Sequence, residues 1–216
     1  SKIEAGQLSI HKHPFNINKL LQELYYQFDM ERKEKEKGGI VISVKSELPD
    51  FAADIESDET RIRQIMSNLI GNAIKFTEKG FIEYGYKMNT ETSQPFIEFY
   101  VKDTGIGISE AKQHIIFERF RQEDDTHSRA FGGTGLGLTI SKALVELLGG
   151  TIWLTSKKNN GTTFYFTIPY KTSDDKLTSV PVHSPDRPVK ENWKDKTVLI
   201  VDDMMVVRDF ITEIIK

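Results

Sequence analysis

The chain has 216 residues and a formal net charge of −3, with 38% hydrophobic and 28% charged residues, a composition typical of globular proteins. The nearly balanced charge gives no electrostatic case for nucleic acid binding. The absence of cysteine excludes a disulfide framework and thiolate chemistry. No apolar stretch approaches the ~20 residues of a membrane span. We therefore expect no membrane contact in this chain and a cytoplasmic location, with any membrane anchor of a parent protein outside it.

The first half of the chain predicts two helices on either side of a strand. Asn18 is a candidate N-cap for the first helix, which carries an apolar stripe at helical spacing. Residues 40–44, rich in β-branched side chains, predict a strand, and residues 48–55 predict a connection. Asp58 is predicted to cap a second amphipathic helix, which contains the stretch Asn68–Thr77.

The second half predicts antiparallel strands that are interrupted by glycine-rich turns. Residues 81–88 and 96–102 predict a hairpin, and the alternation of apolar and polar residues in its second strand predicts one buried face. A short helix is expected from Ser109, and a longer helix is expected after a glycine-rich run. A final hairpin is predicted around residues 159–161, which read Asn-Asn-Gly.

Two side-chain amides and an ammonium share one face of the second predicted helix. Asn68 and Asn72 are one turn apart, and Lys75 follows three residues later. Asparagine is a weak helix former, so helix propensity does not account for the pair. Amide oxygens suit Mg²⁺, and an ammonium suits phosphate. A solvated polar helix face is the alternative reading of the same pattern.

Two glycine-rich segments offer surfaces for a base and for phosphates. Asp103 closes a strand and precedes Gly105 and Gly107. A carboxylate in this place can accept a hydrogen bond from an exocyclic amine, and glycines allow a flat base to lie against the backbone. The run Gly132–Gly137 opens a helix, whose free N–H groups suit an anion. An ordinary glycine turn and a plain loop are the respective alternatives.

The order of these motifs resembles that of the catalytic ATP-binding domain of sensor histidine kinases, in the superfamily that includes gyrase and mismatch-repair ATPases. Asn68–Thr77 resembles the N-box, residues 103–108 the first glycine box, residues 117–120 the F-box, and residues 133–138 the second glycine box. The resemblance covers about residues 12–170. It implies a two-layer α/β sandwich of the Bergerat type, in which a mixed, mostly antiparallel sheet carries three main helices on one face.

The resemblance also implies which residues bind ATP and Mg²⁺. Asn68, Asn72 and Lys75 would be the catalytic residues, with Asn72 as the Mg²⁺ ligand, Asn68 close to the phosphates or the metal, and Lys75 in contact with phosphate. Asp103 would accept the adenine amino group, beside Phe76. The other implied ATP contacts are Gly105, Gly107, Ile108, Gln122, Gly133, Thr134, Gly135, Leu136, Gly137 and Thr162.

The residue at position 68 separates subfamilies. Hydrolytic members of the superfamily carry glutamate there as a general base, whereas the amide of Asn68 cannot take a proton at neutral pH. The resemblance therefore implies a kinase that donates the γ-phosphoryl to a histidine in two-component signalling. None of the five histidines precedes an acidic residue, as the family's phospho-accepting histidine usually does, so we expect that histidine upstream. The alternatives are a degenerate nucleotide-dependent interaction module, and a serine kinase or ATPase of the same superfamily.

The two ends of the chain predict parts of further domains. Residues 1–11 resemble the end of the family's dimerisation helix, and residues 171–196 are expected to be a linker. Residues 197–216 resemble the start of a receiver domain, in which Asp202 and Asp203 would bind Mg²⁺. The implied parent is a homodimeric hybrid histidine kinase. Its expected partners are an upstream histidine phosphotransfer domain and a receiver domain of the same or another chain.

Overall fold

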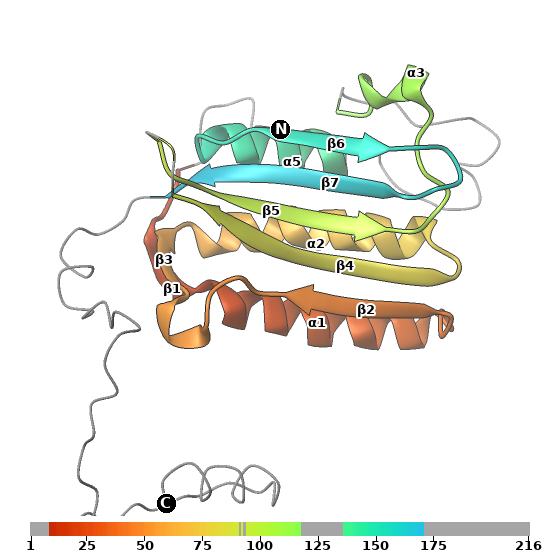
Figure 1. Ribbon diagram of the computed structural model, residues 1–216, viewed down its shortest axis with the longest axis horizontal. Coiled ribbons are helices and arrows are strands. Elements are labelled where there is room, and N and C mark those ends of the chain that lie inside the picture. The colour runs from red at the N-terminus through yellow and green to blue at the C-terminus, as the bar shows by residue number, and fades with distance from the viewer. Residues whose placement is uncertain (1–8, 91, 93, 118–135, 171–216) are drawn as a thin grey trace, which may run out of the picture. The chain divides into compact units, whose positions relative to one another are not determined.

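The computed structural model describes residues 9–90, 92, 94–117 and 136–170. A five-stranded sheet is built, in spatial order, from β2 (Ile40–Lys45), β4 (Gly80–Asn89), β5 (Phe96–Asp103), β7 (Thr162–Pro169) and β6 (Ile152–Ser156). One face of the sheet is covered by helices α1 (Ile17–Glu34), α2 (Glu59–Phe76) and α5 (Gly137–Leu147) (Figure 1). The predicted sandwich, with three main helices on one face of a mixed sheet, is confirmed.

The helix with the asparagine pair is also the crossover between two strands. All neighbouring strands are antiparallel except β2 and β4, which run parallel. Parallel neighbours need a long connection, and α2 lies in that connection. In the centre of the core, Phe99 of β5 stacks on Phe166 of β7 with 4.7 Å between ring centroids. The buried face of α2 therefore packs into the core against the sheet.

The N-cap of α1 is Asn16, so the prediction of Asn18 was wrong. Asn16 Oδ1 accepts a hydrogen bond from the Lys19 amide at 3.1 Å. Asn18 is buried, and its Nδ2 donates to Leu48 O at 2.8 Å and to Asp50 Oδ1 at 2.7 Å. Partners that lie about 30 residues further along the chain therefore occupy the Asn18 side chain.

A short ladder precedes α2, where the sequence predicted only a connection. β1 (His13–Asn16) pairs antiparallel with β3 (Asp54–Ser57), and a 3-10 turn, η1 (Asp50–Ala52), leads into β3. Ile55, which belongs to β3 and pairs with Phe15, is buried in the core. The predicted cap of α2 is confirmed, because Asp58 Oδ1 accepts from the Arg61 amide at 3.1 Å.

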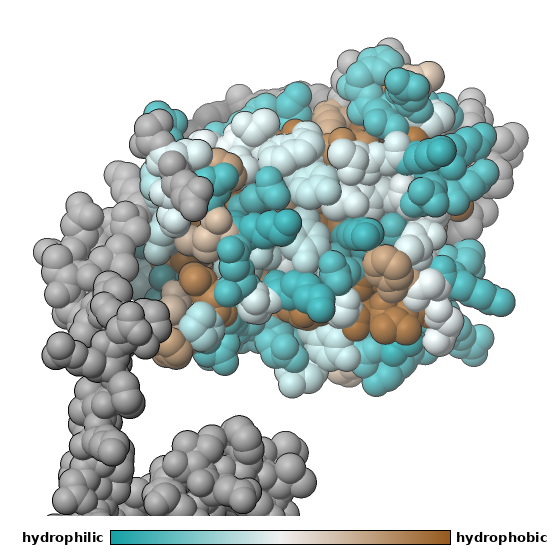
Figure 2. Space-filling model, in the orientation of Figure 1, coloured by the Kyte–Doolittle hydropathy of each residue, from teal (hydrophilic) through white to brown (hydrophobic). Residues whose placement is uncertain are grey.

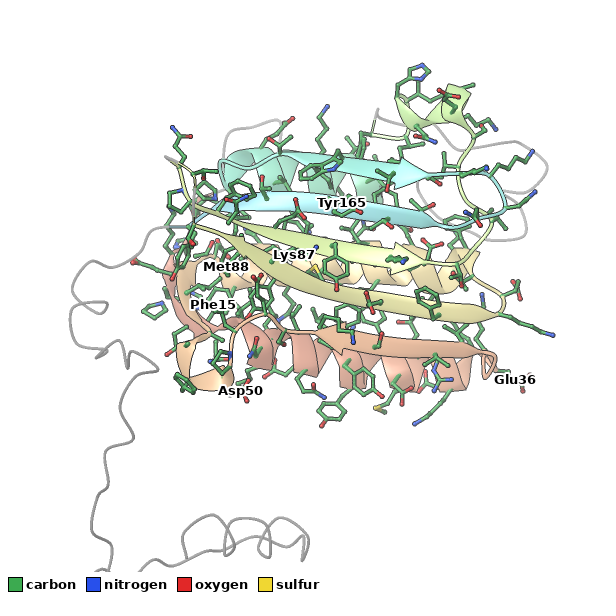
Figure 3. The ribbon with its side chains drawn as sticks, in the orientation of Figure 1. Phe15, Glu36, Asp50, Lys87, Met88 and Tyr165 are labelled. Atoms are coloured by element: carbon green, nitrogen blue, oxygen red, sulfur yellow. The ribbon has the colours of Figure 1, made fainter. Side chains whose placement is uncertain are left out.

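The uncovered face of the sheet is mostly polar. Figure 2 looks onto this face and shows hydrophilic and weakly polar residues with a few hydrophobic spots. Trp153 stacks on Tyr165 with 5.4 Å between ring centroids, and Figure 3 labels Tyr165 on β7 and Lys87 on β4. Within the described part of the chain, no helix has the length and apolarity to cross a membrane. The main core therefore lies between the sheet and its helices.

Candidate functional site

Four segments that are distant in sequence meet at one end of the sheet, on the right in Figure 1. They are the carboxyl end of α2, the carboxyl end of β5 with the turn that follows it, the β6–β7 turn, and the α1–β2 turn, where Figure 3 labels Glu36. The short helix α3 (Glu110–Gln113) follows the β5 turn. The residues predicted to contact a base gather at this end.

Asp103 places a buried carboxylate at the end of β5. Its side chain is 7% exposed, and Oδ1 accepts hydrogen bonds from the Gly105 amide at 2.8 Å and the Thr162 amide at 3.3 Å. Among the described residues, Oδ2 has no hydrogen-bond partner. Burial raises the pKa of Asp103 above its ordinary value of 3.8, while the two amides act to lower it. The carboxylate is thus fixed through one oxygen and can accept from a ligand through the other.

The first glycine of the turn packs tightly against α2. A Cβ at Gly105 would lie 2.3 Å from Phe76 O, the oxygen to which the Ile106 amide donates at 3.2 Å. Phe76 is 37% exposed, unlike the other apolar residues of the α2 stripe, which are buried. An apolar ring therefore stands beside the glycine turn. A hollow of about 380 Å³, which Asp103 does not line, opens next to it between Phe76, Glu78, Lys79, Thr104, Gly105, Ile106 and Asn159.

The second glycine of the turn packs against the β6–β7 turn. Gly107 has φ +64°, and a Cβ there would lie 2.1 Å from Lys157 O. The Ile108 amide donates to Ser156 Oγ at 2.7 Å, and Ser156 Oγ lies 2.9 Å from Thr162 Oγ1. Two of the predicted contacts, Ile108 and Thr162, are therefore joined through the hydroxyl group of Ser156.

Sequence reasoning missed several residues that shape this site. Gly161 has φ +81°, and a Cβ there would lie 2.0 Å from Asp103 O. Gln113 Nε2 donates to Ile108 O at 3.1 Å and to Ser156 O at 2.9 Å. The Asn-Asn-Gly turn was a usable signal for Gly161, because such turns need a positive φ. Gln113 and Ser156 carry no local signal, since their partners are set by the tertiary fold.

Asn68 connects α2 with the start of α5. Its Nδ2 donates to Ser141 Oγ at 2.9 Å, and a Cβ at Gly137 would lie 2.2 Å from its Oδ1. Gly137 is the first residue of α5, after Leu136. The end of the second glycine-rich run and the asparagine helix are therefore in contact. Asn72 lies one turn further along α2 and is half-buried, so its amide oxygen suits a Mg²⁺ ion held jointly with phosphate.

Lys75 brings positive charge to the same end of α2. Its Nζ lies 5.0 Å from the ring centroid of Phe76. Burial and, secondly, the ammonium of Lys35 lower the pKa of Lys75. The charged form of Lys75 is thus somewhat less stable here than in water, and a bound polyanion would offset that cost.

Part of the predicted site lies outside the described residues. This holds for the F-box after Phe117, for the start of the second glycine box, and for the segments 1–8 and 171–216. The individual site residues concerned are Gln122, Gly133, Thr134, Gly135, Asp202 and Asp203.

One α/β sandwich thus combines a buried carboxylate beside two glycines, an amide and ammonium face on a helix, and a second helix that begins at a glycine. Residues 57–172 match the family described as histidine kinase-, DNA gyrase B-, and HSP90-like ATPase. The chain belongs to this family, as a histidine kinase type ATPase domain of two-component signalling.

The similar proteins are sensor kinases. The chain is 37% identical over 205 residues to the autoinducer 2 sensor kinase/phosphatase LuxQ of Vibrio vulnificus, which covers 94% of this chain and 23% of LuxQ. It is 41% identical over 170 residues to the signal transduction histidine-protein kinase BarA of Escherichia coli, covering 78% of this chain and 18% of BarA. Full-length ShkA in complex with AMPPNP has a TM-score of 0.65 at 32% identity, covering 80% of this chain and 34% of ShkA. The chain thus spans about a fifth of the length of these two curated relatives.

Proposed function

We propose that the chain binds Mg-ATP and donates the γ-phosphoryl to a histidine on an upstream dimerisation domain, as the catalytic domain of a protein-histidine kinase. The observation that carries this proposal is the geometry of Asp103. Its Oδ1 is held by two backbone amides, and its Oδ2 can accept from an exocyclic amine. Adenine offers such an amine, whereas guanine would place a carbonyl oxygen against the carboxylate. The site therefore favours adenine nucleotides.

The other site residues divide between base, phosphates and metal. Asn72 would hold Mg²⁺ through its amide oxygen, and Asn68 and Lys75 would contact the phosphates. The metal, when bound, supplies neutralisation of the phosphate charge. The base would lie beside Phe76, Gly105, Gly107, Ile108 and Thr162. The phosphates would meet the backbone of Gly133, Thr134, Gly135, Leu136 and Gly137, with Gln122 as a further contact.

The identity of position 68 favours phosphoryl transfer over hydrolysis. Asn68 has no proton-accepting group at neutral pH, and its Nδ2 already donates to Ser141 Oγ. A serine kinase or ATPase of the superfamily is disfavoured by this asparagine and by the receiver-like tail. A degenerate interaction module is disfavoured by the intact Asp103 site.

The proposed domain organisation follows from the sequence. We assign residues 1–11 to the end of a dimerisation helix, 12–170 to the catalytic domain, 171–196 to a linker and 197–216 to the start of a receiver domain. Asp202 and Asp203 would hold Mg²⁺ in an intact receiver. The parent would be a homodimeric hybrid kinase whose receiver partner belongs to the same or another chain.

The proposal is tested by nucleotide binding followed by phosphotransfer. We expect calorimetry to detect AMPPNP binding that Mg²⁺ strengthens, and GTP to bind much more weakly. With γ-labelled ATP, the chain alone should stay unlabelled, and a supplied upstream helical domain should gain acid-labile label. Absence of AMPPNP binding would refute the proposal. Binding without transfer to the helical domain would favour the interaction module instead.

Replacing Asn72 with alanine should remove the advantage that Mg²⁺ gives to AMPPNP binding. Mg²⁺ keeps few protein ligands, so the loss of one should lower metal-dependent affinity at least about tenfold. Calorimetric titrations with Mg²⁺ and with a chelator measure this advantage directly. Asn89→Ala, at the far end of β4, is the matched control and should behave as the wild type. A Mg²⁺ advantage of wild-type size in Asn72→Ala would remove Asn72 from the metal site.

A further inference from the structure

The carboxyl end of α2 does not provide its own cap. The last four carbonyls of a helix need partners, and many helices supply them by turning back through a left-handed glycine. After Phe76 the chain instead leaves through Thr77 with φ −106° and ψ 127°, an extended conformation. The Thr77 amide donates a hydrogen bond to Ala73 O at 3.0 Å. The carbonyls of Ile74, Lys75 and Phe76 accept hydrogen bonds from groups elsewhere in the chain.

Lys37, in the α1–β2 turn, satisfies two of these carbonyls. Its Nζ donates to Ile74 O at 2.8 Å and to Lys75 O at 3.2 Å. It also donates to Thr77 O at 3.0 Å, just beyond the helix. All three protons of the ammonium are thus directed at backbone oxygens.

The third carbonyl is satisfied by the first glycine turn. The Ile106 amide donates to Phe76 O at 3.2 Å, and Gly105 packs against the same oxygen. Lys37 and the glycine turn therefore cap one helix end together. The backbone of this glycine turn and the ring of Phe76 are the surfaces to which the base was assigned above.

Charge and burial favour an ammonium in this place. The carboxyl end of a helix carries negative potential, which a cation stabilises. The Lys37 side chain is only 17% exposed, so water competes little for its ammonium and for the carbonyls that it contacts. A carboxylate oxygen of Glu78 lies 3.7 Å from Nζ, but Glu78 is 73% exposed and contributes little. The backbone carbonyls are therefore the main partners of Lys37.

We propose that Lys37 is a positioning residue for the nucleotide site. It fixes the carboxyl end of α2 and, through Phe76 O, the glycine turn on which the base would lie. The consequence for binding rests on the proposed function; the capping itself does not. Without the ammonium, the last turn of α2 is open in most molecules, and the apparent nucleotide affinity is the intrinsic affinity multiplied by the fraction of molecules in which the site is formed.

The first test compares nucleotide affinity in matched variants. AMPPNP with Mg²⁺ is titrated by calorimetry, at a temperature where circular dichroism shows every variant fully folded. We expect Lys37→Met to bind about five- to tenfold more weakly, which corresponds to a site formed in about 10–20% of molecules. Lys37→Arg keeps the charge and several donors and should bind within about twofold of the wild type. Lys33→Met removes an exposed lysine from the last turn of α1 and should also bind as the wild type.

The second test does not depend on nucleotide. Amide hydrogen exchange by NMR should show faster exchange of the Ile106 amide in Lys37→Met, because its acceptor sits on the loosened helix end. The Phe99 amide, in the centre of the sheet, reports global opening and should exchange as in the wild type. If Lys37→Met does not fold, Lys37→Gln keeps an uncharged donor and is measured in its place.

The outcomes separate this inference from the proposed function. Wild-type affinity in Lys37→Met, or an equal loss in Lys37→Arg, would overturn the positioning role. Equal acceleration of the Ile106 and Phe99 amides would also overturn it, because the effect would then be global. If the wild type binds no nucleotide, the proposed function fails, and Ile106 exchange still decides whether Lys37 holds the end of α2.

Discussion

Asp103→Asn is expected to weaken AMPPNP binding by about 10- to 100-fold, since it leaves a buried polar contact mismatched. The amide of asparagine can still accept from Gly105 and Thr162 through its oxygen. Its NH₂ group, however, would then face the adenine amine, donor against donor. Calorimetry at pH 7 measures the loss.

The stability of the free protein should respond in the opposite direction. Burial raises the pKa of Asp103, so its contribution to stability is present below the ordinary carboxyl pKa and is lost as pH rises through the folded pKa. Ionised Asp103 therefore destabilises the free protein at pH 7, and Asp103→Asn should leave the free energy of unfolding unchanged or higher. Denaturant unfolding checks this expectation. A variant that is destabilised and binds AMPPNP normally would contradict the assignment.

The pH dependence of binding adds a second readout. Adenine favours the ionised carboxylate, so wild-type affinity should fall as pH is lowered through the raised pKa of Asp103, above 3.8. Binding in that range should release protons, which calorimetry in buffers of different ionisation enthalpy detects. Asp103→Asn should lose this proton release. Asp54→Asn carries the same charge change on β3, at the other end of the fold, and should keep it.

Gly105→Ala is expected to impair both folding stability and nucleotide binding. The added Cβ would lie 2.3 Å from Phe76 O and 3.0 Å from Asp103 Oδ1, well inside normal contact distance. Overpacking of this kind costs about 1–3 kcal/mol of unfolding free energy. Because the clash also displaces the Asp103 carboxylate, AMPPNP affinity should fall about as far as in Asp103→Asn. Denaturant unfolding and calorimetry measure the two effects.

The α1–β2 turn offers a matched control for Gly105→Ala. A Cβ at Gly38 would meet no atom within 4 Å, so Gly38→Ala should fold and bind as the wild type. If Gly105→Ala also bound AMPPNP normally, the close approach of the glycine turn to α2 would not matter for the site, and the base would have to lie elsewhere.

The sequence was informative where local signals and tertiary demands agree. The cap at Asp58 and the apolar stripe of α2 predicted the asparagine helix, and the alternation in β5 predicted its buried face. The glycines at 105 and 107 were predicted as places where a flat base lies against the backbone. In the structure each glycine packs closely against protein backbone, Gly105 against Phe76 O and Gly107 against Lys157 O. Their role in binding a base stays a prediction.

The predictions that were wrong or missing share one physical cause. Asn16 and Asn18 give the same local capping signal, and only the distant partners Leu48 and Asp50 assign Asn18 to another task. β3 is too short and too charged to read as a strand, and it forms because β1 lies beside it. Lys37 ends the charged run of residues 31–37, and nothing in that run indicates that its ammonium caps a helix end 37 residues further on. In each case the deciding contact was absent from the local sequence.

The chain enters and leaves the sandwich at the end remote from Asp103. At the entry, β1 pairs with β3, which leads directly into the amino end of α2. At the exit, β7 ends at Pro169, which pairs with Phe96, the first residue of β5. Eight residues of β7 separate that exit from the site, a span of about 26 Å. A flexible tether needs roughly 20–25 residues to have that average reach. Reporter proteins or affinity tags attached at residue 12 or 170 through shorter tethers should therefore leave nucleotide access unobstructed, whereas longer tethers would raise the local concentration of their cargo at the site.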